Sequence, residues 1–156
     1  MQCLGRRLVR RQRLRRPGTG RAYARGRELW ERLGSPLEFL QVPFGQSVYH
    51  LNRGEINLAT RLDEGLLRLS RERSNSGGLI LGHLSRGRNL MFAGRFASSR
   101  AHYEKTLALY DPLSHSSLAH QVGVHPHVNA QAFLGIVLFL SRLSRPSGGT
   151  GQCSNR

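Results

Sequence analysis

Cysteine, lysine and long apolar runs are all scarce in this chain of 156 residues. Its two cysteines, Cys3 and Cys153, lie near opposite ends of the sequence, which predicts neither a disulfide framework nor a zinc site built on cysteine. The longest apolar run, Phe133 to Leu140, has 8 residues, whereas a membrane-spanning helix needs about 20. We therefore expect no membrane segment, and a cytoplasmic protein.

Acidic residues are missing from positions 1–27, where ten of the arginines lie. Because Lys105 is the only lysine, the excess of arginine indicates GC-rich codon usage more than selection for phosphate binding. Residues 1–20 combine like charges with Pro17, Gly18 and Gly20, which predicts a disordered head. An arginine-rich leader without acids also fits an organelle transit peptide.

The arginine-rich head is the one candidate for binding nucleic acid. Its guanidinium groups can neutralise phosphates, which gives salt-sensitive, non-specific binding. The head contains no aromatic residue that would stack on single-stranded bases. Nucleic-acid binding is therefore the alternative function. The main functional prediction comes from the patterned region after the head.

From residue 21 onward, apolar residues recur at helical spacing and are interrupted by glycine, proline or serine. Helices are predicted over 21–33, 36–53 (kinked by Pro43), 56–73, 79–91, 96–110 and about 127–143. Residues 74–78 are predicted to be a loop, and 113–126 a longer loop with one helical turn. In the helix 56–73 we place Asp63 on the exposed, charged side. Residues 144–156 are predicted to be a flexible polar tail.

Two of the helical pairs resemble each other at a constant offset, because Phe44, Ile56 and Leu67 fall on Leu84, Phe96 and Leu107. The small and turn residues at the corresponding positions are Ser47, Gly54 and Ala59 in the first pair, and Gly87, Gly94 and Ser99 in the second, which ends at Pro112. A period in this range is typical of helical solenoids. The sequence therefore predicts an all-α fold: an α-solenoid of helical hairpins over residues 21–143.

The predicted last helix is apolar nearly all round, with Val128, Phe133, Ile136, Val137 and Phe139 on different faces. Such a helix needs cover on more than one side, and the polar tail that follows it cannot supply that cover. We therefore expect self-association through this helix. A degenerate gene fragment without an independent role is a further alternative, and it would aggregate through the same helix.

The two helical pairs resemble tetratricopeptide repeats, in which small residues let the two helices of a hairpin approach closely. The matches are Ser47, Leu51, Gly54, Ile56 and Ala59 in the first pair, and Gly87, Leu90, Gly94, Phe96, Ser99 and Tyr103, followed by Asp111 and Pro112, in the second. The spacing departs from that family, whose period is about 34 residues.

A more specific resemblance covers about residues 21–140. The stretches LNRGEINLATRLDEGLLRLSRERSNS and GRFASSRAHYEKTLALYDPLSH are similar to the tetratricopeptide-like C-terminal region of bacterial signalling proteins. Those proteins carry an adenylate/guanylate cyclase domain and an AAA-type ATPase before this region. The resemblance implies a non-catalytic regulatory or protein-binding module. No phosphate-binding loop or cyclase metal carboxylate is present here, so the catalysis of that family does not carry over.

A solenoid of this kind binds proteins or peptides on the concave wall formed by the first helices of its hairpins. The residues that we predict on that wall are Gln41, Val48, Asn52, Ser85 and Arg88. The histidines at 115, 120, 125 and 127 raise the question of a metal site, but they lack helical spacing and a carboxylate partner set. Asp111, Ser114 and His115 lack the nucleophile elbow of a hydrolase. We therefore expect no catalytic residues, no metal and no cofactor.

Overall fold

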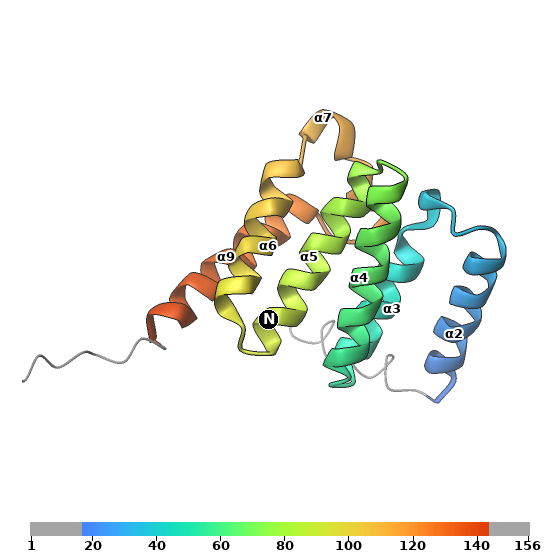
Figure 1. The fold of residues 1–156 in the computed structure, drawn as a ribbon, viewed down its shortest axis with the longest axis horizontal. Helices are drawn as coiled ribbons and strands as arrows, with labels where there is room; N and C mark the ends of the chain where they lie inside the picture. Colours follow the sequence, from blue (N-terminus) through green and yellow to red (C-terminus); the bar gives the residue numbers. More distant parts are fainter. Residues whose placement is uncertain (1–16, 144–156) are drawn as a thin grey trace, which may run out of the picture.

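A computed structural model describes residues 17–143 of the chain, and every regular element in this range is helical. The long helices are α2 (Pro17–Arg32), α3 (Gln41–Asn52), α4 (Ile56–Glu72), α5 (Ser76–Phe92), α6 (Phe96–Leu109) and α9 (Pro126–Leu143). The short elements are the 3-10 helix η1 (Leu37–Phe39), α7 (Pro112–His115) and α8 (Leu118–Val122). The predicted all-α class is therefore confirmed. Figure 1 shows the long helices following one another from α2 at one end to α9 at the other.

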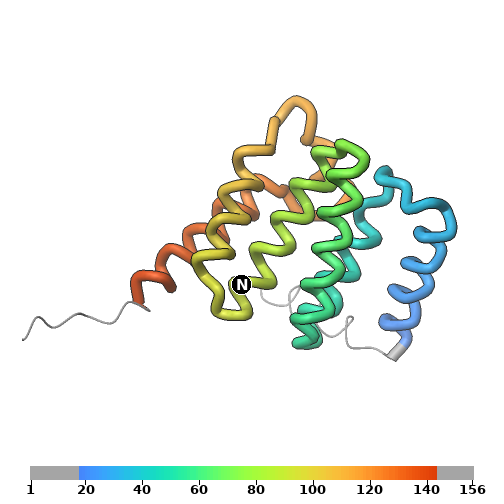
Figure 2. Tube along the Cα trace, viewed as in Figure 1, coloured from blue at the N-terminus to red at the C-terminus, as the bar shows by residue number. Residues whose placement is uncertain are grey.

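Each of the first four connections between long helices contains the same left-handed turn. After α3, the Gly54 N–H donates to the carbonyl of Leu51 at 2.9 Å, and the Glu55 N–H donates to that of His50 at 3.0 Å. This pair of bonds is the Schellman motif, which satisfies the free carbonyls of a helix end. The corresponding residues with positive φ are evenly spaced along the chain, at Gly34, Gly54, Ser74 and Gly94. Figure 2 shows the chain reversing direction at these turns.

The N-terminal boundaries differ from the predicted ones. Helix α2 begins at Pro17, inside the segment 1–20 that we predicted to be disordered, and proline is favoured in the first turn of a helix. The predicted helix 36–53 is divided into η1 and α3, with Leu40 between them. Pro43 then lies in the first turn of α3, where no hydrogen bond is lost and no kink is required. The remainder of the predicted head, 1–16, and the predicted tail, 144–156, lie outside the described residues.

The two predicted loops are largely helical. Gly77 and Gly78 belong to the first turn of α5, where the Asn75 side chain caps the helix by accepting from the Gly78 N–H at 2.6 Å. A Cβ on Gly78 would lie 2.1 Å from the Ser70 Oγ, so this glycine permits close contact between α4 and α5. The segment 113–126 contains most of α7 and all of α8, where we expected one helical turn.

Helix α5 is the centre of the fold. It packs against α4 and α6 and also contacts α3 and α9. Ile80, Leu81 and Leu84 of α5 are at most 1% exposed. They share one hydrophobic core with residues of five neighbouring helices, namely Phe44, Leu66, Tyr103, Leu118 and Val137. Removing the side chain of such a residue typically costs about 2–5 kcal/mol of stability.

Both helical hairpins, α3–α4 and α5–α6, join their helices at equivalent small residues. In the first, the Ser47 hydroxyl donates to the Ala59 carbonyl at 3.4 Å. In the second, the Ser99 hydroxyl donates to the Gly87 carbonyl at 2.7 Å. A Cβ on Gly87 would lie 3.0 Å from the ring of Tyr103. The constant offset in the sequence is therefore matched by equivalent contacts. Pro112, by contrast, occupies the first position of α7.

Candidate functional site

A buried polar cluster joins α3, α4 and α5, and we define it as Ser47, Asp63, Ser85, Arg88 and Asn89. The Asn89 amide donates to the Asp63 Oδ2 at 2.5 Å and to the Ser47 Oγ at 3.3 Å. The hydroxyls of Ser47 and Ser85 lie 3.0 Å apart. The Arg88 Nη2 donates to the Ser85 Oγ at 3.1 Å. One network thus connects two consecutive hairpins.

The position of Asp63 contradicts our prediction, which placed it on the exposed side of its helix. Its side chain is 1% exposed. Asp63 is four residues after Ala59 and three before Leu66, so it lies on the same helical face as these buried residues. The charge of Asp63 suggested the exposed face of α4, whereas its spacing from Ala59 and Leu66 places it on the buried face.

Burial dominates the electrostatics of the polar cluster. It raises the pKa of Asp63 to about 6, although the hydroxyls of Ser47 and Ser85 and the guanidinium groups of Arg88 and Arg86 act in the opposite direction. Burial also lowers the pKa of Arg88. Among the described residues, Asp63 Oδ1 and Arg88 Nε have no hydrogen-bond partner. Ionised Asp63 is therefore costly in the folded protein.

The polar cluster has no access for a substrate. Ser47, Asp63, Ser85 and Asn89 are all between 0 and 1% exposed. The guanidinium of Arg88, the one half-buried member of the cluster, lies over the ring of Phe44, 5.5 Å from its centroid. The cluster therefore fixes how α3, α4 and α5 pack, and it does not form an open reaction site.

The five residues that we predicted on a concave wall differ in burial. Ser85 is fully buried, so our placement of this residue on a binding surface is wrong: its hydroxyl faces α3 rather than solvent. Arg88 and Val48 are half-buried, and both pack against the core through Phe44 or directly. Gln41 and Asn52 are exposed at opposite ends of α3, about 16 Å apart along the helix axis. Of the five, Gln41, Val48, Asn52 and Arg88 therefore keep some surface exposed to solvent.

Three of the four histidines of the predicted group are arranged around one aromatic ring, and His120 is not among them. The rings of His115, His125 and His127 lie within 5.3–5.8 Å of the Tyr110 ring, measured between centroids. His115 is buried, with its Nε2 2.8 Å from the Ser76 Oγ and its Nδ1 accepting from the Asp111 N–H at 3.0 Å. Within residues 17–143, no three metal-ligating side chains are grouped to hold an ion.

Sequence reasoning missed a separate pair of histidines on α5 and α6. The Nδ1 atoms of His83 on α5 and His102 on α6 lie 2.8 Å apart. Burial lowers the pKa of each ring to about 4, and nearby cations, among them Lys105 and Arg71, act in the same direction. These positive charges disfavour a metal cation between the rings. No sequence motif marks this pair. Only the positions of the two residues on neighbouring helices could have indicated that they meet.

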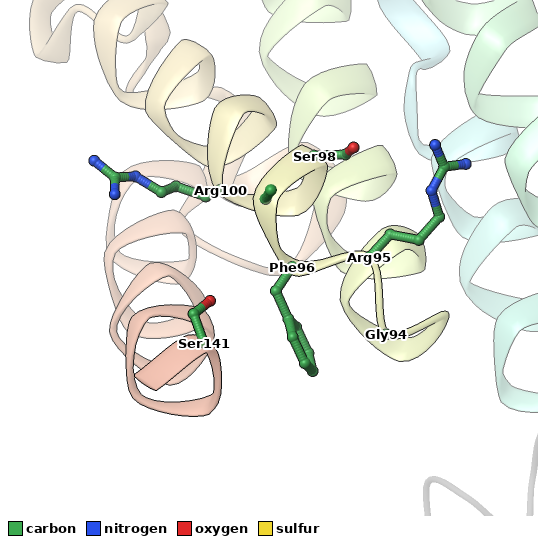
Figure 3. A pocket seen from close by; sticks show the side chains of 7 residues that line it. Gly94, Arg95, Phe96, Ser98, Arg100 and Ser141 are labelled. Atoms are coloured by element: carbon green, nitrogen blue, oxygen red, sulfur yellow. The ribbon is translucent and has the colours of Figure 1, made fainter. Parts of the chain in front are cut away.

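An open hollow lies between the first turn of α6 and the last turn of α9. Gly94, Arg95, Phe96, Arg100 and Ser141 line it. Figure 3 shows that the side chains of Arg95 and Arg100 point in opposite directions, while Phe96 points into the gap between the helices. Arg100 is also paired with Glu104 at 2.7 Å. Since the charged groups do not converge, the hollow does not resemble a site for a small charged ligand.

None of the helices between Pro17 and Leu143 combines the length and apolar character required to cross a bilayer. Comparisons of the chain with protein-family models, with curated proteins and with solved structures find no match.

Proposed function

We propose that this protein is a non-catalytic, protein-binding module built as an α-solenoid of tetratricopeptide-like hairpins. The observation that carries the proposal is the correspondence of the two hairpins: Ser47 contacts Ala59 and Gly87 contacts Ser99 at corresponding positions of the repeat, with the hydroxyl donor on the first helix in one hairpin and on the second helix in the other. The identical turns at Gly54 and Gly94 support it. Stacked hairpins of this kind present an extended surface that serves as a binding platform.

The binding surface in this proposal is formed by Val48, Asn52 and Arg88. Val48 packs against the hydrophobic core, and the guanidinium of Arg88 lies over the ring of Phe44, which is part of that core. A partially exposed arginine over an aromatic ring offers an acidic peptide both a charge and an apolar contact. The partner that fits is therefore an extended or helical peptide with acidic and apolar residues.

The experiment selects peptides from a phage-displayed random library against the full chain, and then measures their affinity for variants. We expect Val48→Glu and Arg88→Gln each to weaken a selected peptide by about tenfold or more. Arg61→Gln is the matched control, because it removes one positive charge from an exposed position on α4. Thermal melts followed by circular dichroism check that each variant remains folded.

Two results would overturn this proposal. One is a failure of the library to yield any peptide that binds above background. The other is a selected peptide whose affinity falls as much with Arg61→Gln as with Arg88→Gln, since binding would then follow net charge rather than the named surface.

The resemblance to the sensor region of bacterial cyclase and ATPase signalling proteins suggests a role for this module in signal transduction. Its support is the similarity of the stretches 51–76 and 94–115 to that region. Sequencing the genomic region around the coding frame tests it: we expect an AAA-type ATPase segment upstream in the same or an adjoining frame. An unrelated upstream gene would count against the signalling assignment and leave the peptide-binding proposal intact.

A further inference from the structure

Helix α9 carries an apolar face that none of the described residues covers. Its inner face is closed, because Ala130 and Val137 are fully buried against the core. Its outer face exposes the large side chains of Val128, Ile136, Leu138, Phe139 and Leu143, with Phe139 63% exposed. Apolar rows of this length on a helix normally pack against another surface.

The outer face has the spacing of a helix-packing stripe. Val128, Ala132, Gly135, Phe139 and Leu143 follow one another at intervals of three or four residues, so they lie along one side of the helix. A Cβ on Gly135 would meet no atom within 4 Å, whereas a Cβ on Gly87 of α5 would meet the Tyr103 ring. The middle of the stripe is therefore open to the close approach of a helix.

We propose that α9 of a second copy of this chain packs antiparallel on this stripe, with a two-fold axis between Gly135 and Ile136. About that axis, Phe139 of one copy lies opposite Ala132 of the other, and Ile136 opposite Gly135. Leu143 likewise lies opposite Val128. Each large side chain thus faces a smaller one, and a single patch complements itself as an isologous interface requires.

The distribution of charge selects the antiparallel arrangement. Arg142 is the only formally charged residue between Pro126 and Leu143, and it lies in the last turn. A parallel pair would place the two Arg142 side chains next to each other. The antiparallel pair separates them by most of the length of the helix, where screening removes their repulsion.

The sequence that follows α9 is poor in large apolar side chains. The sequence from Ser144 to Arg156 contains no leucine, isoleucine, valine, methionine or aromatic residue. It therefore lacks the side chains that would fill the spaces beside Phe139 and Gly135. A second α9 provides those side chains in the register described above.

The oligomeric state of the full chain tests the proposal first. In sedimentation at concentrations up to about 100 µM, we expect a dimer for the parent chain. We expect Phe139→Glu to weaken dimerisation roughly 100-fold, because it places two charges in the apolar seam. The control is Leu113→Glu, at a 92% exposed leucine on α7, which should leave the dimer unchanged. Since both side chains are exposed in the monomer, neither change should alter its melting temperature.

Cysteine cross-linking tests the register. In a Cys3→Ser, Cys153→Ser background, Gly135→Cys should form a disulfide with itself across the axis on mild oxidation. Leu143→Cys alone should not, because the two copies of residue 143 would be about 22 Å apart along the helices, far beyond disulfide reach. A mixture of Val128→Cys and Leu143→Cys chains should cross-link to each other.

Three outcomes would overturn the proposal. A monomer at all concentrations would assign the stripe to a different partner. A dimer that survives Phe139→Glu would use another surface. Efficient self-linking of Leu143→Cys would show a parallel pair. None of these results bears on peptide binding at Val48 and Arg88, so the two proposals fail separately.

Discussion

Replacing Asp63 by asparagine should stabilise this protein at neutral pH, although it removes a charged residue from a hydrogen-bonded cluster. Burial raises the pKa of Asp63 from 3.8 to about 6, so the folded state favours the protonated, neutral form. The sign follows from linkage: the stabilising contribution of Asp63 is fully present below its unfolded pKa and is lost as the pH rises from about 4 to about 6. Above pH 6 the full penalty of the charge is present.

The size of the effect follows from the shift. A pKa change of about two units corresponds to roughly 3 kcal/mol in the free energy of unfolding. The Asp63→Asn variant resembles the protonated form, and its side-chain oxygen can still accept the hydrogen bond from Asn89. We therefore expect it to be up to about 3 kcal/mol more stable than the parent at pH 8, and within about 1 kcal/mol of it at pH 4.

Urea unfolding followed by circular dichroism at pH 8 and pH 4 measures both differences. Glu64→Gln, at the next position of α4, is the matched control, because it removes the same charge from an exposed side chain and should change stability by less than about 1 kcal/mol. The competing view is that Asp63 is the required counter-charge of half-buried Arg88. In that case Asp63→Asn would destabilise the protein by about 3–5 kcal/mol at pH 8, and that result would refute the reasoning.

Two further predictions use the histidine pair and the turns. Because burial lowers the pKa values of His83 and His102 to about 4, the pair contributes stability above pH 6.5 that is lost as the pH falls towards 4. Replacing both residues by glutamine in the Asp63→Asn background should therefore flatten the fall in urea midpoint between pH 7.5 and pH 5. An unchanged slope would contradict this origin of the pH dependence. Gly94→Ala should destabilise the protein by about 1–2 kcal/mol, because the turn holds φ at +73°. Gly65→Ala on α4, where a Cβ meets no atom within 4 Å, should instead stabilise it by up to about 1 kcal/mol, and equal thermal shifts for the two alanine variants would disprove the role of the turn.

The helices could be predicted from the sequence because their signals are local. The apolar spacing that defines α4, α6 and α9 is contained within each helix. The turns at Gly54 and Gly94 are marked by residues that tolerate positive φ. These signals do not depend on which helices become neighbours, so a single sequence is enough to locate the elements.

The features that sequence reasoning placed wrongly all depend on neighbouring helices. Gly77 and Gly78 look like loop residues, and only the proximity of Ser70 to Gly78 shows that glycine is needed at that position of α5. Ser85 looks like a surface residue until Ser47 of the preceding hairpin is found against it. Polar residues at close helix contacts cannot be told in the sequence from polar residues in solvent, because a single sequence does not show which residues of a neighbouring helix lie against them.

The spacing of the four left-handed turns has a consequence for how the chain folds. Each turn is closed by hydrogen bonds between residues close in sequence, and each joins helices that are neighbours along the chain. Such contacts give a low contact order, and helical proteins of low contact order fold in microseconds to milliseconds. The connection between α6 and α9 interrupts this regularity, since Tyr110 to His125 intervene and only α7 and α8 lie between. Among the contacts between consecutive long helices, docking of α9 on α6 therefore has the longest loop to close, and we expect it to form last of these.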